Sequence, residues 1–301
     1  MKALKTVVGM SALLALAACD SQTENSKEEA AETTAMTEAP AQEPQQAAEE
    51  APGDTILKIL TSSHRSDANR ARDEYRNPEE TLFFFGLERD DTVIEVNPGG
   101  GWYMEIIAPF VKEEGQYIAL QPNPELADMP SYIVRQAEQI QTRFDEQTAV
   151  YGDAELRFYN PADPTLGEPE SADMVLTFRN THNWINAGQA PAMFAAFAEV
   201  LKPGGVLGVV QHRAEDNAPA EETASSGYVS EQEVIELAEA AGLELEDRSN
   251  INANPRDTHD HPEGVWTLPP TLRLGEENRD VYQEIGESDR MTLRFVKPDP
   301  Q

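Results

Sequence analysis

The segment from Asp91 to Phe110 constrains the fold more than any other part of this sequence. It opens with the β-branched run TVIEV, which has the length and composition of a buried strand. An Asn-Pro-Gly-Gly-Gly turn follows at residues 97–101, and apolar residues then recur at helical spacing. A strand, a glycine turn and a helix in this order bring backbone N–H groups close to a ligand. Because a Cβ atom would obstruct that approach, the glycines indicate a ligand-binding loop.

Strand-like and helix-like segments alternate along the rest of the chain. The sequence predicts strands over 93–96, 116–120, 155–159, 172–178, 206–210, 243–248 and 291–296. Helices are expected over 78–87, 131–147 and 190–201, and from Ser230, which forms a capping box with Glu233, to Gly242. Repeated β–α units predict an α/β, doubly wound, mostly parallel seven-stranded sheet. Since no helix separates the last two strands, the last strand is expected to be antiparallel.

The glycine turn resembles motif I of the class I S-adenosylmethionine (SAM)-dependent methyltransferases, (D/E)-x-G-x-G-x-G. Glu95 takes the acidic position, Asn97 the first glycine, Gly99 the second and Gly101 the third. Asn tolerates a left-handed backbone better than most residues, so this replacement is mild. The phrases LKPGGVLGVV and DMV match the family before strand five and at the start of strand four. The resemblance spans about residues 78–297 and implies a methyltransferase fold.

More narrowly, the chain resembles a group of secreted bacterial predicted methyltransferases that share PGGGWY and an ending similar to ESDRMTLRFVKP. The resemblance implies a SAM site at Glu95, Asn97, Gly99, Gly100, Gly101, Tyr103, Gln121 and Asn160. In the family, an acid ending strand two holds the ribose hydroxyls and an acid ending strand three contacts adenine. Here these positions are the amides Gln121 and Asn160, which accept hydrogen bonds without charge. A weaker SAM site and a domain that no longer binds SAM both remain open.

The N-terminus predicts export and a lipid anchor. Two lysines precede an apolar run that ends in Leu-Ala-Ala-Cys, so residues 1–19 are expected to be a lipoprotein signal peptide with lipidation at Cys19. Residues 20–54 carry ten acids against one lysine and no aromatic residue, which predicts a disordered acidic tether. A methyltransferase-like domain is expected over 55–301, opening with a helical extension over 55–88. The chain is thus expected to be an exported, membrane-anchored lipoprotein on the periplasmic side.

The charge of the chain disfavours nucleic acid as a partner. The signal carries +2 and the tether −9 of the net −32, which leaves −25 for residues 55–301. An acidic surface repels phosphate backbones, so the electrostatic term that drives nucleic-acid binding has the wrong sign. Within the extension, residues 55–76 contain several arginines among acids. They predict a polar helix, either a lid over a substrate or a solvated helix with local ion pairs.

Histidines follow several of the predicted strands. His182, with Asn183 and Trp184, comes after strand four, His212 ends strand five, and His259 and His261 lie between strands six and seven. Ligands of open α/β sheets lie at the carboxyl ends of the strands, so these loops are expected on one rim. The residues could bind substrate and supply a general base, form a metal site, or be ordinary loop residues. The candidate catalytic residues are His182, Asn183, Trp184 and His212, and no metal ligand is assigned.

Two functions are consistent with the sequence. The first is a membrane-tethered SAM-dependent methyltransferase acting on a small molecule, a lipid-linked compound or a protein side chain. The second is a non-catalytic ligand- or metal-binding lipoprotein that reuses the cofactor cleft. Because SAM is made in the cytosol, the predicted export is the main argument for the second.

Overall fold

The structure of the protein is a computed structural model that describes residues 52–300. The predicted signal peptide, Cys19 and all but the end of the acidic tether lie outside the described residues. The first helix begins at Pro52, three residues before the expected start of the domain. None of the helices within 52–300 combines the length and the apolar character needed to cross a membrane.

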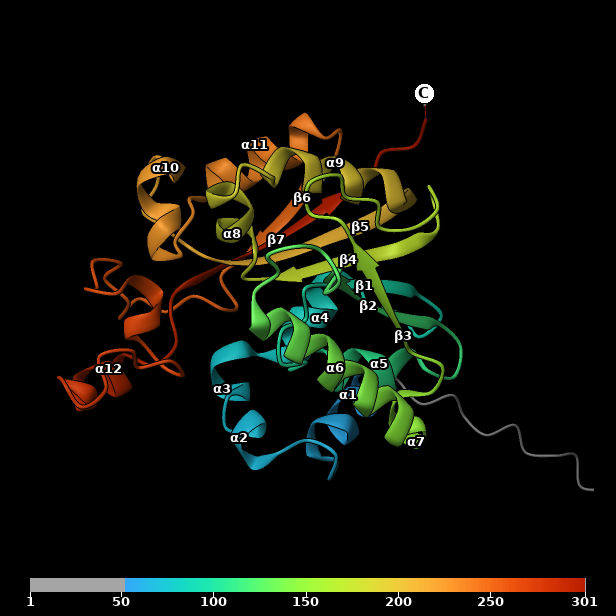
Figure 1. Ribbon diagram of the computed structural model, residues 1–301, viewed down its shortest axis with the longest axis horizontal. Coiled ribbons are helices and arrows are strands. Elements are labelled where there is room, and N and C mark those ends of the chain that lie inside the picture. Colours follow the sequence, from blue (N-terminus) through green and yellow to red (C-terminus); the bar gives the residue numbers. More distant parts are fainter. Residues whose placement is uncertain (1–51, 301) are drawn as a thin grey trace, which may run out of the picture. The chain divides into compact units, whose positions relative to one another are not determined.

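A seven-stranded sheet in the order β3-β2-β1-β4-β5-β7-β6 forms the centre of the domain (Figure 1). The strands are β1 (Thr92–Val96), β2 (Gln116–Pro122), β3 (Glu155–Tyr159), β4 (Ala172–Phe178), β5 (Leu201–His212), β6 (Glu244–Ser249) and β7 (Arg290–Val296). Neighbours from β3 to β5 pair in parallel, whereas β7 is antiparallel to both β5 and β6. The predicted α/β fold with an antiparallel last strand is therefore confirmed.

Helices cover both faces of the sheet (Figure 1). They are α1 (Pro52–Thr61), α2 (Asp67–Arg70), α3 (Asp73–Arg76), α4 (Pro78–Phe85), α5 (Met104–Val111), α6 (Ser131–Glu146), α7 (Thr148–Tyr151), α8 (Thr181–Asn186), α9 (Ala190–Val200), α10 (Ala220–Thr223), α11 (Glu231–Ala240) and α12 (Arg279–Ile285), with 3-10 turns η1 (Ala224–Ser226) and η2 (Gly264–Thr267). Helices α8, α9 and α11 contribute to one apolar core, and α1, α4, α5, α6 and α7 to the other. The predicted cap of α11 is present, because Ser230 accepts a hydrogen bond from the backbone of Glu233.

The prediction of one polar helix over 55–76 is wrong, since the segment forms three short helices. Ser66 begins α2 as an N-cap that accepts from the Asn69 backbone, and Asn77 ends α3 with a left-handed φ of 39°. Arg65 is only 1% exposed and donates to the Leu60 carbonyl and to Asp73. Side chains that bond carbonyls at a helix end stop the helix there. The segment is thus neither a continuous helix nor fully solvated.

The turn between β1 and α5 has the geometry that its glycines predict. Asn97 and Gly99 adopt positive φ values of 53° and 61°, as expected for glycine positions of the motif. Gly101 has φ 79°, and a Cβ there would lie 2.7 Å from Cε of Met104. Gly100 has no such constraint, because a Cβ there would meet nothing within 4 Å. The fold itself therefore requires glycine at 101, whereas position 100 is open.

The pair Gly101→Ala and Gly100→Ala tests this difference. We expect Gly101→Ala to lower the free energy of unfolding by about 1–3 kcal/mol, because alanine is strained at positive φ. Gly100→Ala is expected to change it by no more than about 0.5 kcal/mol. Urea denaturation of both variants measures the two effects, and equal losses would contradict the geometry described.

Candidate functional site

A small cavity of about 210 Å³ lies beside the glycine turn at the carboxyl end of β1. Gly99 and Gly100 form one side of it, and Phe178 and Asn180, at the end of β4, form another. The ring of Tyr103 also borders it and stacks on Phe178 with centroids 3.6 Å apart. The carboxyl ends of the two central strands thus open onto one space, which we call the smaller cavity.

Glu95 lines the smaller cavity and is 2% exposed. Its Oε2 accepts a hydrogen bond of 2.5 Å from the hydroxyl of Tyr117 on β2. Burial raises the pKa of Glu95 to about 7, although this hydrogen bond and the nearby Arg179 and Arg76 oppose the shift. The carboxyl group is therefore close to half-ionised at neutral pH, and a cation placed beside it would favour the charged form.

A larger cavity of about 570 Å³ adjoins the smaller one. Three arginines line both cavities, and we call Arg72, Arg76 and Arg179 the shared wall. The candidate residues His182, Asn183 and His212 line the larger cavity, as the sequence predicted for one rim. Its far side is formed by the segment that includes η2 and the residues before β7: Val265, Trp266, Pro269, Pro270, Thr271, Arg273, Glu287 and Ser288.

The two histidines of the larger cavity are neutral at physiological pH. Their ring centroids lie 5.8 Å apart. Burial lowers the pKa of His182 to about 4. Burial and then the neighbouring His182 hold the pKa of His212 well below its ordinary value. Nδ1 of His212 lies 2.5 Å from the hydroxyl oxygen of Ser288, which fixes the ring at the start of β7.

The hydrogen bonds around His182 indicate its tautomer. The side-chain nitrogen of Gln211 donates to the carbonyl of Gly227 over 2.9 Å, and it lies 3.2 Å from Nδ1 of His182. Because the amide nitrogen is a donor, Nδ1 accepts and Nε2 carries the proton of the neutral ring. His182 can therefore donate a hydrogen bond from Nε2, whereas its low pKa makes it a weak base.

Glu287 holds the arginines of the site together. Its carboxylate accepts from Nε of Arg72 at 2.6 Å and from Nε of Arg76 at 3.3 Å, and it also pairs with Arg290. Burial alone would raise its pKa, but Arg290 and Arg76 hold the pKa below its ordinary value. Three guanidinium groups therefore share one carboxylate, and they join the N-terminal segment to β7.

Four predicted site residues do not line either cavity: Gly101, which lies beside Met104 in the turn, and three residues with larger side chains. Trp184 is 3% exposed and packs in the core, with its ring centroid 5.5 Å from that of Phe197. Residues two apart on a helix point about 200° apart, so Trp184 faces away when His182 faces the cavity. Gln121 is buried at the end of β2, and Asn160 turns its Oδ1 toward the backbone of Ala162. The expectation that these three side chains face the site is corrected.

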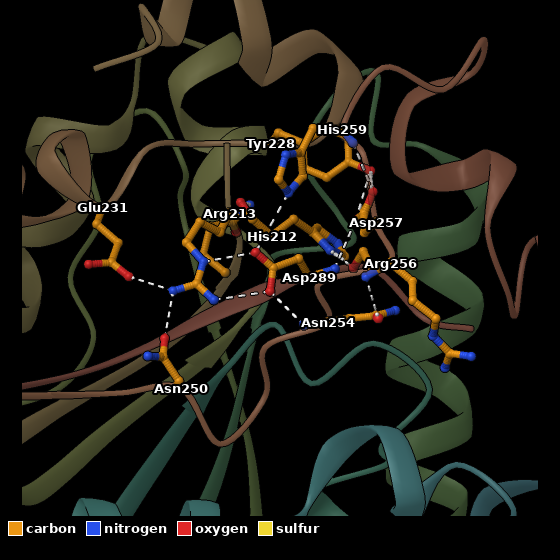
Figure 2. Close-up of polar contacts among 12 residues, drawn as sticks. His212, Arg213, Tyr228, Glu231, Asn250, Asn254, Arg256, Asp257, His259 and Asp289 are labelled. Atoms are coloured by element: carbon orange, nitrogen blue, oxygen red, sulfur yellow. Dashed lines mark hydrogen bonds and ion pairs between the residues drawn. The ribbon is translucent and has the colours of Figure 1, made fainter. Parts of the chain in front are cut away.

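His259 and His261 belong to a different cluster. Figure 2 shows His259 beside Asp257 and Asp289, and His261 pairs with Asp257. Nε2 of His259 lies 3.6 Å from Asp289, and Nε2 of His261 lies 2.9 Å from Asp257. Tyr228 donates to Asp257 as well. Within residues 52–300, no group of three or more His, Cys, Asp or Glu side chains is arranged to hold a metal ion. The cluster connects the loop before α12 to the start of β7. Neither His259 nor His261 lines the larger cavity.

Most of the charged residues of the site were not predicted from the sequence. Arg179 directly follows the predicted fourth strand, which is where a ligand contact is expected. Glu287 and Arg290 lie in ESDRMTLRFVKP, the phrase that carried the narrower resemblance. These residues therefore lie in segments that the sequence already singled out. That Glu287 pairs with Arg72 and Arg76 could not be predicted, because these residues are far apart in the sequence.

Glu95→Gln tests the buried carboxyl group through the pH dependence of stability. Folding raises the pKa of Glu95 from 4.5 to about 7, so the protonated side chain contributes favourably to the free energy of unfolding. That contribution is complete below pH 4.5 and is lost as pH rises through 7. We expect the variant to exceed wild type in unfolding free energy by about 2–3 kcal/mol at pH 8, and to match it near pH 4.5. Urea denaturation at both pH values measures this, with the exposed Glu138→Gln as control. A difference independent of pH would contradict it.

Comparison with known proteins is informative for the fold. No protein-family model matches the sequence, and no curated protein matches it either. Among solved structures, the [4+2]-cyclase SpnF matches with a TM-score of 0.54 and 13% identity, covering 82% of this chain and 93% of its own. Geranyl diphosphate C-methyltransferase from Streptomyces coelicolor A3(2) matches with a TM-score of 0.51 and 16% identity, and the match covers 79% of this chain and 87% of that one. A geranyl diphosphate methyltransferase in complex with SAM matches with a TM-score of 0.50 and 15% identity, and the match covers 80% of this chain and 94% of that one. The chain therefore has the class I methyltransferase fold.

Proposed function

We propose that the protein is a SAM-dependent methyltransferase whose acceptor occupies the larger cavity. The observation that carries this proposal is the position of the smaller cavity, which lies beside the glycine turn and shares a wall with the larger one. Methyl transfer requires a cofactor and an acceptor held side by side with little other chemistry. Two adjoining cavities at the carboxyl ends of β1 and β4 provide that arrangement.

One feature of the described residues fits SAM. The backbone at Gly100 is open, since even an added Cβ would meet nothing within 4 Å. The buried side-chain nitrogen of Gln121 has no hydrogen-bond partner within residues 52–300, but it lines neither cavity and offers no contact to SAM there. When bound, SAM would supply an electrophilic methyl group on a sulfonium sulfur. In this proposal Glu95, Asn97, Gly99, Gly100 and Tyr103 hold it.

The residues of the larger cavity would orient the acceptor. His182 offers an N–H donor at Nε2, and the exposed Asn183 offers both an amide donor and an acceptor. His212, whose Nδ1 lies beside the hydroxyl of Ser288, would also orient the acceptor by hydrogen bonding, because its low pKa makes it a weak base as well. Trp184 supports α8 from the core. A cavity of about 570 Å³ lies within the range of small-molecule sites, roughly 300–1,000 Å³, which favours a small acceptor or the head group of a lipid-linked compound over a folded protein.

We also propose that the protein is exported and held at a membrane through a lipid on Cys19. The lysines, the apolar run and the Leu-Ala-Ala-Cys sequence of residues 1–19 support export and lipidation. The acidic segment that follows would keep the domain extended from an anionic lipid surface. The net charge of the domain also argues against a nucleic-acid substrate.

A non-catalytic binding lipoprotein is the second candidate. It is favoured by one observation, namely that neither Gln121 nor Asn160 lines either cavity. The two cavities adjoin the glycine turn and the arginines, and neither is lined by the two positions expected to bind adenosine. The name of SpnF, a [4+2]-cyclase, also shows that proteins of this fold are not restricted to methyl transfer.

Calorimetric titration of the full chain with SAM separates the two candidates. We expect saturable binding to wild type and at least about tenfold weaker binding to Gly99→Asp, because the new carboxylate side chain obstructs the turn. Gly204→Asp is the matched control. Gly204 also has a positive φ, 77°, and open space for a Cβ, but it lies in the turn before the main part of β5. Equal affinity losses in the two variants, or no binding to wild type, would contradict the methyltransferase proposal.

His182→Ala and Glu95→Ala test the division of roles once an acceptor is in hand. We expect His182→Ala to lower turnover about tenfold or more while leaving SAM affinity nearly unchanged, because it faces the larger cavity. Glu95→Ala is expected to weaken SAM binding more than turnover at saturating SAM. Steady-state kinetics together with SAM titration measure both quantities. Parallel losses in turnover and affinity for both variants would show that the roles are not separate.

A further inference from the structure

The shared wall and its surroundings carry more positive charge than the nearby acids neutralise. Arg72, Arg76 and Arg290 all pair with the single carboxylate of Glu287. Arg76, Arg290 and Glu287 are each no more than 3% exposed, so water compensates little of this excess. Glu287 is the only acid that lines the larger cavity within the described residues. An excess of buried positive charge therefore surrounds the space where the acceptor would lie.

Arg179 adds a cation that forms no direct ion pair. Its side chain forms no hydrogen bond or ion pair with any residue in 52–300, although it lines both cavities. Burial and then the nearby Arg290 lower the pKa of Arg179 to about 10, and the carboxylate of Glu287 offsets only part of that shift. Its backbone has a φ of 64°, a strained conformation for a residue with a long side chain. Strain of this kind is typical of residues held in place at a ligand site.

Two further guanidinium groups have buried donors without partners. Nη1 of Arg76 and Nε of Arg290 are inaccessible and have no hydrogen-bond acceptor in the described part of the chain. A buried donor of a charged group that lacks an acceptor costs free energy. An oxyanion in the larger cavity would supply a countercharge for Arg179 and for the guanidinium groups of Arg76 and Arg290, two residues that also line that cavity. Phosphate and carboxylate oxygens match the forked geometry of guanidinium groups.

The remaining lining offers contacts for more than a bare ion. Tyr132, Val265, Trp266 and Pro269 add apolar and aromatic surface to the larger cavity, although Arg273 also lies there, over the ring of Trp266. Both histidines are neutral and add hydrogen bonds rather than charge. The combination of cationic and apolar surface fits an organic molecule that carries one anionic group.

We infer that the acceptor is a small organic anion, bound in the larger cavity through a phosphate or carboxylate group held by Arg179, Arg76 and Arg290. This inference rests on the proposed function, since it names the acceptor class of the same site. Arg290 lines the larger cavity and not the smaller one, which places the anion on the acceptor side rather than beside the glycine turn.

Titration of the full chain with pyrophosphate and, separately, with citrate tests the inference. Trp266 lines the larger cavity and Trp102 packs against Arg76, so tryptophan fluorescence reports on the site. Potassium chloride at equal ionic strength is the reference for screening. We expect a saturable change with at least one of the two oxyanions, and the tighter of them indicates whether the site prefers phosphate or carboxylate.

Arg179→Gln and Arg157→Gln form a matched pair of variants. Each removes one positive charge, but Arg157 lies at the surface and pairs with Glu155 at 2.6 Å. We expect Arg179→Gln to weaken oxyanion binding at least about tenfold and Arg157→Gln to leave it within about twofold. Circular dichroism confirms that both variants are folded. A response no different from that to chloride, or equal losses in the two variants, would overturn the inference.

Titration of the same samples with SAM distinguishes this inference from the proposed function. Binding of SAM without saturable binding of either oxyanion overturns the inference alone and leaves methyl transfer in place. Saturable oxyanion binding without SAM binding upholds the anion site and contradicts the methyltransferase proposal, in favour of an anion-binding protein.

Discussion

The interaction on which the site depends is the sharing of Glu287 among three arginines. Arg72 directly precedes the short helix α3 and Arg76 ends it, whereas Arg290 begins β7. Removing one partner of a buried charge pair is far more costly than the net contribution of the pair. Without Glu287, Arg72, Arg76 and Arg290 would lose the carboxylate that all three pair with. One carboxylate thus holds the N-terminal segment against the sheet and at the same time leaves the surplus of positive charge that an anion can use.

The fold could be predicted from the sequence because its signals are local. The central strands β1, β2 and β4 are mostly apolar runs bounded by turns, and Asn97 adopts the left-handed conformation that its place in the motif implies. The segment 55–76 was mispredicted because its burial is not local. Arg65 and Arg76 are charged residues, yet each is no more than 2% exposed. Arg76 is bound by Glu287, which lies 211 residues further along the chain. No pattern within the segment itself reports such a contact.

The candidate site was predicted in part, and its errors have geometric causes. His182, Asn183 and His212 were expected on one rim because each follows a strand of a parallel sheet, and all three line the larger cavity. Trp184 was expected beside them because residues 182–184 were predicted to form a loop. These residues lie in helix α8, which turns Trp184 toward the core. Gln121 ends its strand as expected but is buried beneath the surface of the site. Strand order predicts which ends meet, but not how far each side chain reaches.

The distance in sequence between the arginines and Glu287 bears on how the protein is made. Arg72 and Glu287 are separated by 215 residues, and a chain leaves the ribosome from its N-terminus. The first helices, the glycine turn and most of the sheet are therefore synthesised while the guanidinium groups still lack their carboxylate. The pocket cannot be completed until the final strand arrives, so its closure marks the end of biosynthesis of the domain. A polypeptide truncated before that strand would retain much of the sheet-forming sequence but no finished binding pocket.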